Sequence, residues 1–156
     1  MVSPFHHLVR GVITNNSKVL VAHALGYSNT FLPGGHIEFN ESAKDALIRE
    51  INEELGISCE VGKFLGLVEH KWMKNGEIHC EINQLFAVSS DELEVNKNPI
   101  SKEDHIEFLW IDVTELENIN LQPYPLRDLI KNYLNGEKQA QWASSLNNEI
   151  DEYNIN

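Results

Sequence analysis

Apolar and polar residues alternate along several short stretches, a pattern typical of half-buried strands. An early pair at residues 8–14 and 18–24 is separated by Asn15, Asn16 and Ser17, which predicts a hairpin. A second pair at residues 59–72 and 78–88 flanks Asn75-Gly76, the dipeptide most typical of a tight hairpin turn. A further strand is predicted at residues 106–111, after a long polar loop that contains Pro99.

A period of 3.6 residues replaces the alternation between residues 42 and 55. This period predicts a helix that ends at Gly56, because glycine readily adopts the left-handed conformation of a helix C-terminus. The helix has an apolar stripe and an opposite polar face at Asp45, Arg49 and Asn52. The stripe is formed by Ala43, Ala46, Leu47, Ile51 and Leu55.

The same period returns at residues 125–134, which predicts a second helix that ends near Gly136. Residues 137–156 are weakly patterned, and we expect a short helix around residues 140–146 within the same domain. With its length of 156 residues, the chain is expected to fold as one domain at residues 1–136 plus this tail. The order of the elements predicts an α/β fold with a mixed sheet between helices.

Three glutamates of the first predicted helix lie toward its apolar stripe and not on its solvent-facing side. Glu50, Glu53 and Glu54 are spaced i, i+3, i+4, so they are neighbours on one surface, and Glu54 projects along the line of Leu47 and Ile51. Carboxylates this close repel one another, and burial adds a cost unless they are paired or bind a metal. A hard cation such as Mg²⁺ would relieve both costs, because it prefers oxygen ligands and bridges carboxylates to phosphates.

These glutamates stand within a longer pattern that begins at Gly35. Gly35, Glu41, Arg49, Glu50, Ile51, Glu53, Glu54, Gly56 and Ile57 match every position of the Nudix box, G-x5-E-x7-R-E-U-x-E-E-x-G-U, in which U is aliphatic. The chain therefore resembles the Nudix hydrolase family, of the MutT-like kind, over about residues 5–134. The resemblance implies the Nudix α/β/α sandwich and a pyrophosphohydrolase that cuts a diphosphate linkage in a nucleoside diphosphate joined to a group X.

The resemblance also implies a role for each matching position. Glu50, Glu53 and Glu54 would bind Mg²⁺, or Mn²⁺, together with the backbone carbonyl of Gly35. Arg49 would orient the carboxylates. Glu41 would hold the loop against the helix, and Gly56 would end the helix.

The general base varies within the family, so two candidates stay open here: Glu53 of the box and Glu103 of the loop before the last strand. For substrate binding we expect Phe31, His36 and Trp72, with Tyr27, Tyr124, Arg10 and Lys18 as further candidates. Each could equally be a packing or surface residue. His70 and His79 are expected to face each other across the second hairpin, without the spacing of a zinc site.

The formal net charge of −12 argues against a nucleic-acid backbone as partner, because there is no basic patch to release counterions. It does not exclude a small phosphorylated substrate, whose charge a metal can balance. Cys59 and Cys80 are expected to be half-buried thiols. Neither a signal peptide nor a membrane span is apparent, so we expect a cytoplasmic protein without a membrane partner. A homodimer is left open.

The substrate itself is not specified by the sequence. Secondary motifs of the ADP-ribose, NADH and coenzyme A members of the family are absent. A nucleoside triphosphate pyrophosphohydrolase remains the main alternative. A non-catalytic nucleotide sensor and an isoprenoid-diphosphate isomerase rank below it, because the box is intact.

Overall fold

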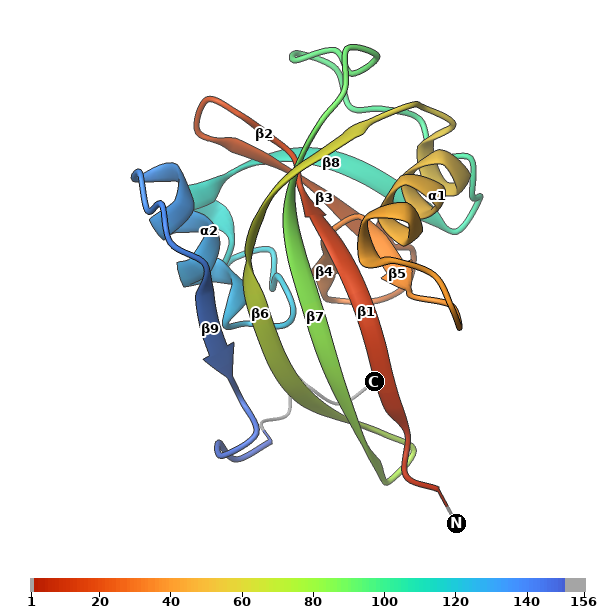
Figure 1. The fold of residues 1–156 in the computed structure, drawn as a ribbon, viewed down its shortest axis with the longest axis vertical. Helices are drawn as coiled ribbons and strands as arrows, with labels where there is room; N and C mark the ends of the chain where they lie inside the picture. Colours follow the sequence, from red (N-terminus) through yellow and green to blue (C-terminus); the bar gives the residue numbers. More distant parts are fainter. Residues whose placement is uncertain (1, 151–156) are drawn as a thin grey trace.

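The computed structural model describes residues 2–150 and contains two sheets with a helix on either side (Figure 1). The larger sheet has the order β5-β1-β7-β6-β9, and the smaller one joins β2, β3 and β4, with β8 added beside β3. In chain order the strands are β1 Phe5–Val12, β2 Thr14–Asn15, β3 Lys18–Ala24, β4 Thr30–Phe31, β5 Gly34–His36, β6 Glu60–Lys74, β7 Glu77–Ser89, β8 Ile106–Asp112 and β9 Gln141–Ser144.

The two helices are α1 Ala43–Leu55 and α2 Leu126–Leu134, and a 3₁₀ turn, Val113–Glu115, follows β8. The Ser42 side chain caps α1 by accepting a hydrogen bond from the Asp45 amide at 3.1 Å. At the other end Gly56 has φ of 69°, and its amide donates to the Asn52 carbonyl at 2.8 Å. Both predicted helices and both ends of α1 are thus confirmed.

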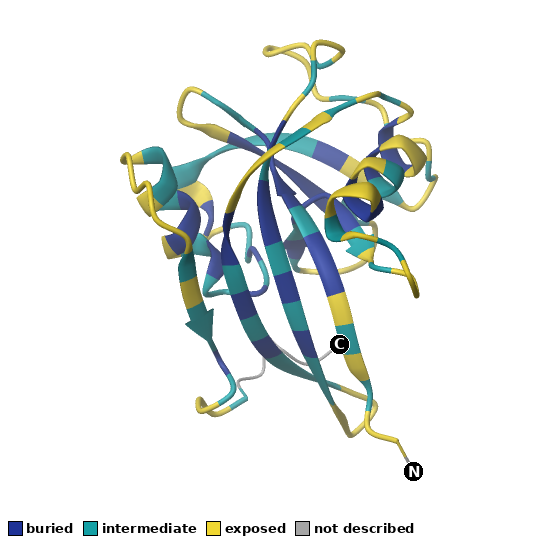
Figure 2. Ribbon diagram, in the orientation of Figure 1, coloured by how far each residue is buried: buried dark blue, intermediate teal, exposed yellow. Residues whose placement is uncertain are grey.

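Two apolar cores lie on opposite faces of the strands, which makes the molecule a three-layered α/β/α sandwich as predicted. One core joins Leu47 and Ile51 of α1 to Val9, Phe86 and Phe108. The other joins α2 to the reverse face of the same strands, through residues such as Leu85, Leu126 and Ile130. Figure 2 shows the buried inner side and the exposed outer side of α1.

The first predicted hairpin is only partly correct. The turn at Asn15–Ser17 does join two antiparallel strands, but these are the short β2 and the start of β3. Most of residues 8–14 belongs to β1, which pairs antiparallel with β5 and parallel with β7. The alternation of apolar and polar residues indicates which face of a strand is buried, but it does not indicate which strand lies next to it. Here the chain passes from the larger sheet to the smaller one between Val12 and Thr14.

The second hairpin is confirmed, with Asn75 and Gly76 at positive φ in its turn. The helix expected around residues 140–146 is wrong, because Gln141–Ser144 forms β9, parallel to β6. Gly66 permits this pairing: a Cβ there would lie 2.0 Å from the carbonyl oxygen of Gln141. Among residues 2–150, no helix is long and apolar enough to cross a membrane.

Candidate metal and phosphate site on helix α1

Helix α1 and the loop after β5 place the acidic residues of the box at one edge of the larger sheet, where α1 packs beside β5. Glu54 is 4% exposed. The side chain of Glu50 is 17% exposed and that of Glu53 is 53% exposed. The three carboxylates therefore run from the core to the surface, with Glu54 innermost, as the helical spacing predicts.

The Arg49 guanidinium ties these carboxylates to the loop. It donates two hydrogen bonds to Glu41, from Nε at 2.8 Å and from Nη2 at 2.9 Å, and one from Nη1 to Glu50 at 3.0 Å. It also reaches Glu53 at 3.4 Å and the His36 carbonyl at 3.1 Å. The bidentate bond from Arg49 holds the pKa of Glu41 down at about 2, so Glu41 stays ionised.

The pKa of Glu54 is shifted upward, in the opposite direction to that of Glu41. Burial, the largest cause, raises its pKa to about 8, and the negative charges of Glu50 and Glu103 act in the same direction. Arg10 and a hydrogen bond from the Gly34 amide, at 3.3 Å, oppose the shift. A buried carboxylate that faces two other carboxylates is a group whose ionised form a cation would stabilise.

This environment predicts a pH dependence of stability in metal-free protein. Because the pKa of Glu54 is higher in the folded than in the unfolded state, its contribution is fully present below about pH 4.5 and is lost as pH rises through about 8. We expect the Tm of the metal-free wild type to fall over this range relative to Glu54→Gln, as measured by thermal unfolding in EDTA. Parallel Tm curves for the two proteins would contradict the assignment.

Glu50 packs directly against the backbone of Gly35. A Cβ at Gly35 would lie 2.5 Å from the Glu50 carboxyl carbon and 2.7 Å from each of its oxygens. Any side chain at position 35 would therefore push this carboxylate away. The absence of a Cβ at Gly35 lets the carboxylate and the loop backbone face the same small volume.

Gly35→Ala should consequently impair activity more than stability. The added methyl meets the flexible end of Glu50, and Gly35 is not among the residues with positive φ. We expect roughly a 10²-fold loss in kcat/KM, since displacement by about 1 Å at a reacting centre has that effect. Gly62→Ala is the matched control, because its Cβ would meet only Ala87 O at an ordinary 3.5 Å. Equal effects of the two substitutions would refute this explanation.

Glu103, predicted as a candidate base, lies within electrostatic range of Glu54. Its loop is fastened to the end of α1, because the Lys102 amide donates to the Glu54 carbonyl at 2.7 Å. Glu107, from the same region, instead pairs with His23 at 2.9 Å on the β3–β8 ladder. The structure thus brings Glu103 to the site and places Glu107 elsewhere.

Among residues 2–150, no group of three or more His, Cys, Asp or Glu side chains is gathered for a metal ion. Glu50 and Glu53 are turned toward Arg49 instead. The Arg49–Glu53 contact is long, at 3.4 Å, and Glu53 is half exposed, so its carboxylate can turn at little cost. The donor set that the box resemblance implies is all oxygen and includes the buried Glu54, so its chemistry suits a hard divalent cation.

The candidate substrate-binding residues fall into two places. Phe31 lies beneath the Arg10 guanidinium, which is 5.5 Å from its ring centre and whose charge acts on Glu54. His36 and Trp72 belong to a row of four rings across β5, β1, β7 and β6. The His36, His6 and His79 rings are hydrogen-bonded in series at 3.0 and 2.9 Å, and Trp72 stacks on His79 at 4.2 Å.

The prediction that His70 faces His79 is wrong, because the ladder sets Trp72 opposite His79 and Glu81 opposite His70. His6 was missed, because only the parallel pairing of β1 with β7 brings it beside His79. Burial, helped by the neighbouring imidazoles of His36 and His79, lowers the pKa of His6, and Glu81 opposes this shift.

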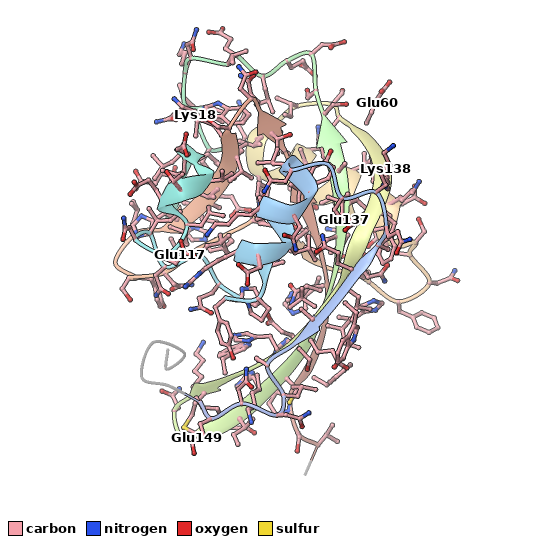
Figure 3. All side chains as sticks on the ribbon, turned by 90° about the vertical axis from the view of Figure 1, so that its left-hand side faces the viewer. Lys18, Glu60, Glu117, Glu137, Lys138 and Glu149 are labelled. Carbon is pink, nitrogen blue, oxygen red and sulfur yellow. The ribbon has the colours of Figure 1, made fainter. Side chains whose placement is uncertain are left out.

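Of the two basic candidates, Arg10 lies at the site and Lys18 does not. Lys18 is on the β3–β8 ladder opposite Asp112, and Figure 3 labels it there. A cavity of about 660 Å³ opens between the β3–β4 loop and the segment before α2. It is lined in part by Gln122, Tyr124 and Arg127 and contains none of the glutamates of α1, so a role of Tyr124 in substrate binding stays a prediction. Glu117, labelled in Figure 3, lies on its rim beside Lys131.

Helix α1 thus carries three carboxylates on neighbouring positions, and Arg49 ties two of them to the loop that follows β5. The model of the NUDIX domain matches residues 5–133, and the chain belongs to the Nudix family. Nudix hydrolases generally use divalent metals.

Individual relatives agree with this membership. The chain is 32% identical over 116 residues to an RNA pyrophosphohydrolase of Ruthia magnifica, covering 65% of this chain and 64% of the relative. It is 36% identical over 83 residues to an isopentenyl-diphosphate Δ-isomerase of Cereibacter sphaeroides, covering 52% and 45%. The chain thus spans about half to two thirds of the length of these curated relatives.

Solved structures agree on the fold. The crystal structure of a MutT protein from Bacillus halodurans superposes with a TM-score of 0.68 at 18% identity, covering 89% of this chain and 88% of that one. A UDP-X diphosphatase superposes with a TM-score of 0.62 at 17% identity, covering 92% and 68%.

Proposed function

We propose that this protein is a divalent-metal-dependent hydrolase that cleaves the diphosphate linkage of a nucleoside diphosphate joined to a group X. One observation carries the proposal: the buried Glu54 lies with Glu50 and Glu103 in a cluster of negative charge, beside the backbone of Gly34 and Gly35. Membership of the Nudix family supports the same reaction class.

In the proposed reaction, water attacks one phosphorus and the bridging P–O bond breaks. A nucleoside monophosphate and phospho-X are released, and the proton of the water goes to a carboxylate. The metal ion, when bound, neutralises phosphate charge and lowers the pKa of a bound water. Glu50, Glu53, Glu54 and the Gly35 carbonyl would hold it.

The other residues of the site hold the carboxylates in place, face the substrate phosphate or accept a proton. Arg49 keeps Glu50 and Glu41 in place through its hydrogen bonds. Arg10 supplies a positive charge beside Glu54 that can face a substrate phosphate. Glu53 and Glu103 are the two candidates for the proton acceptor, because Glu53 is half exposed at the end of the row of carboxylates and Glu103 comes near Glu54 from the loop before β8.

A second candidate is a nucleoside triphosphate pyrophosphohydrolase, which would release pyrophosphate. Similarity to the RNA pyrophosphohydrolase, and to a CTP pyrophosphohydrolase of Escherichia coli at 36% identity over 62 residues, favours it. The same site would serve, because both reactions attack a phosphorus within a phosphoanhydride chain.

Product analysis separates these candidates. Purified protein with Mg²⁺ or Mn²⁺ would be incubated with nucleoside triphosphates, ADP-ribose, sugar nucleotides and dinucleoside polyphosphates, and the products resolved by anion-exchange chromatography. A nucleoside monophosphate with phospho-X supports the first proposal, and one with pyrophosphate supports the second. Intact nucleotides throughout, together with isomerisation of isopentenyl diphosphate in a parallel incubation, would overturn both in favour of the isomerase.

A further inference from the structure

An apolar face of the larger sheet lies open to solvent on the α1 side, where β1, β6 and β7 run beyond the helix (Figure 1). Neighbouring strands contribute six apolar side chains that form this open face: Phe5, Leu67, Ile78, Cys80, Ile82 and Trp142. Neither apolar core of the described chain includes them. The open face is therefore a separate apolar surface of the sheet.

The strand registers place these residues on one side of the sheet. Phe86 packs in the core under α1, and Ile82, four residues from it on β7, projects to the same side. Residues aligned in a ladder share a side, which places Phe5 of β1, Leu67 of β6 and Trp142 of β9 there as well. The open face thus continues the side that α1 covers further up the sheet.

The composition of the open face differs from that of the chain as a whole. Phe5, Ile78 and Trp142 are 64%, 49% and 69% exposed, although they are large and apolar. The chain has 24 Asp and Glu residues, but the described strands place a single carboxylate, Glu69, and a single cation, Lys71, on this face. Exposed apolar and aromatic residues with few charges characterise the centre of a protein interface.

Strand β7 directs its apolar residues outward along this stretch. Glu81 and Asn83, on the inner side, are buried, while Ile78 and Ile82 project outward. A strand with one solvated face normally has the reverse arrangement, with polar residues outside. The pattern of β7 therefore fits a sheet whose outer side is covered.

We propose that this cover is a second copy of the chain, packed face to face about a two-fold axis. Glu69 and Lys71 are two positions apart on β6 and project to the same side. An axis that crosses the strands between these positions sets Glu69 of each copy opposite Lys71 of the other. The same axis sets Ile82, which is aligned with Glu69, opposite Cys80, which is aligned with Lys71.

The charges of the open face favour this occupant over a basic partner. The face carries one charge of each sign, so it is complementary to itself, whereas the net charge of −12 would draw a basic partner to other surfaces. The Lys71 ammonium donates to the Leu146 carbonyl at 2.9 Å. An ammonium has three N–H donors, so this bond leaves two for Glu69 of the second copy.

The size of the open face suits a dimer of modest affinity. Four strands about 4.8 Å apart, each covering up to about seven residues, give a footprint of roughly 400 Å² before the relief of the side chains is counted. Phe64, which is 39% exposed on the same side of β6, extends it toward α1. The contact then approaches the lower end of specific interfaces, about 600 Å² on each partner.

Sedimentation velocity of the full chain, without substrate or metal, tests the proposal independently of the proposed function. The wild type should be a dimer at the upper end of a series from about 1 to 100 µM. Ile82→Glu adds an unpaired carboxylate beside the axis in both copies and should raise the dimer Kd at least about 100-fold. Ile100→Glu, which changes an 80% exposed apolar residue outside the face, is the control and should leave Kd unchanged.

Charge reversal distinguishes a second copy from any other partner, and it serves if Ile82→Glu fails to fold. Lys71→Glu sets like charges opposite each other twice and should raise Kd about 10-fold or more. Combining it with Glu69→Lys restores both pairs and should return Kd to within about 3-fold of the wild type. Circular dichroism checks that each variant is folded.

Each outcome decides the proposal. A dimer that Ile82→Glu and Lys71→Glu weaken, and that the double reversal restores, would support it. A monomer at every concentration would overturn it and leave the open face to a different protein. A dimer that neither single change weakens would show that the copies meet elsewhere, and weakening without restoration would overturn the two-fold pairing.

Discussion

Glu54→Gln should reduce kcat by roughly 10³-fold or more while leaving the fold intact. The side chain is buried at the centre of the carboxylate cluster, and a metal ion held there stabilises transition-state charge by several kcal/mol. Gln has nearly the same shape but carries no charge, so its amide oxygen binds a divalent cation much more weakly than the carboxylate does. Steady-state kinetics with the substrate found by product analysis measures the loss.

Stability provides the control for this substitution. Because burial disfavours the ionised form of Glu54, the metal-free variant should be no less stable than the wild type at pH 8. Added Mg²⁺ should raise the Tm of the wild type more than that of the variant, since only the wild type retains all three charged ligands. Near-normal turnover by the variant would remove Glu54 from the catalytic machinery.

Arg49→Lys should lower kcat/KM by about 10- to 100-fold, the range typical of residues that orient metal ligands. Arg49 holds Glu41 through two donors and reaches Glu50 and the His36 carbonyl with its remaining nitrogens. A lysine keeps the charge but has no planar fork, so it cannot make these contacts together. The substitution retains the positive charge and therefore separates geometry from electrostatics.

The rate as a function of Mg²⁺ concentration distinguishes an orienting role from a purely structural one. If Arg49 positions the ligands, the lysine variant should require more Mg²⁺ for half-maximal rate. The expected effect on Tm is small in comparison, because the side chain is about one quarter exposed. A large fall in Tm with an unchanged Mg²⁺ requirement would show that Arg49 serves only the fold.

Much of this site could be predicted from local sequence, because one helix and one loop build it. The helical period alone placed Glu54 along the line of Leu47 and Ile51, and all three are buried. Ser42 and Gly56 fix the ends of the helix through local hydrogen bonds that depend on neighbouring residues only. Local rules suffice where the interacting groups are within a few turns of one another.

The features that were missed depend on pairing between distant segments. His6 and His79 are 73 residues apart and meet through a parallel ladder that alternation cannot specify. Likewise, Gln141–Ser144 becomes a strand because Gly66 lets β6 approach it, although its own sequence has little strand pattern. The open face of the larger sheet became apparent only when the positions of α1 and β9 were known.

The metal dependence of turnover, measured on the wild type and Glu54→Gln, tests the central claim most directly. After removal of metal with EDTA, the account predicts no hydrolysis of the phosphoanhydride substrate. Adding Mg²⁺ or Mn²⁺ should restore hydrolysis in the wild type and leave the variant roughly 10³-fold slower. Equal turnover in EDTA and in Mg²⁺, or equal turnover by the two proteins, would contradict a metal-dependent hydrolase built on these carboxylates.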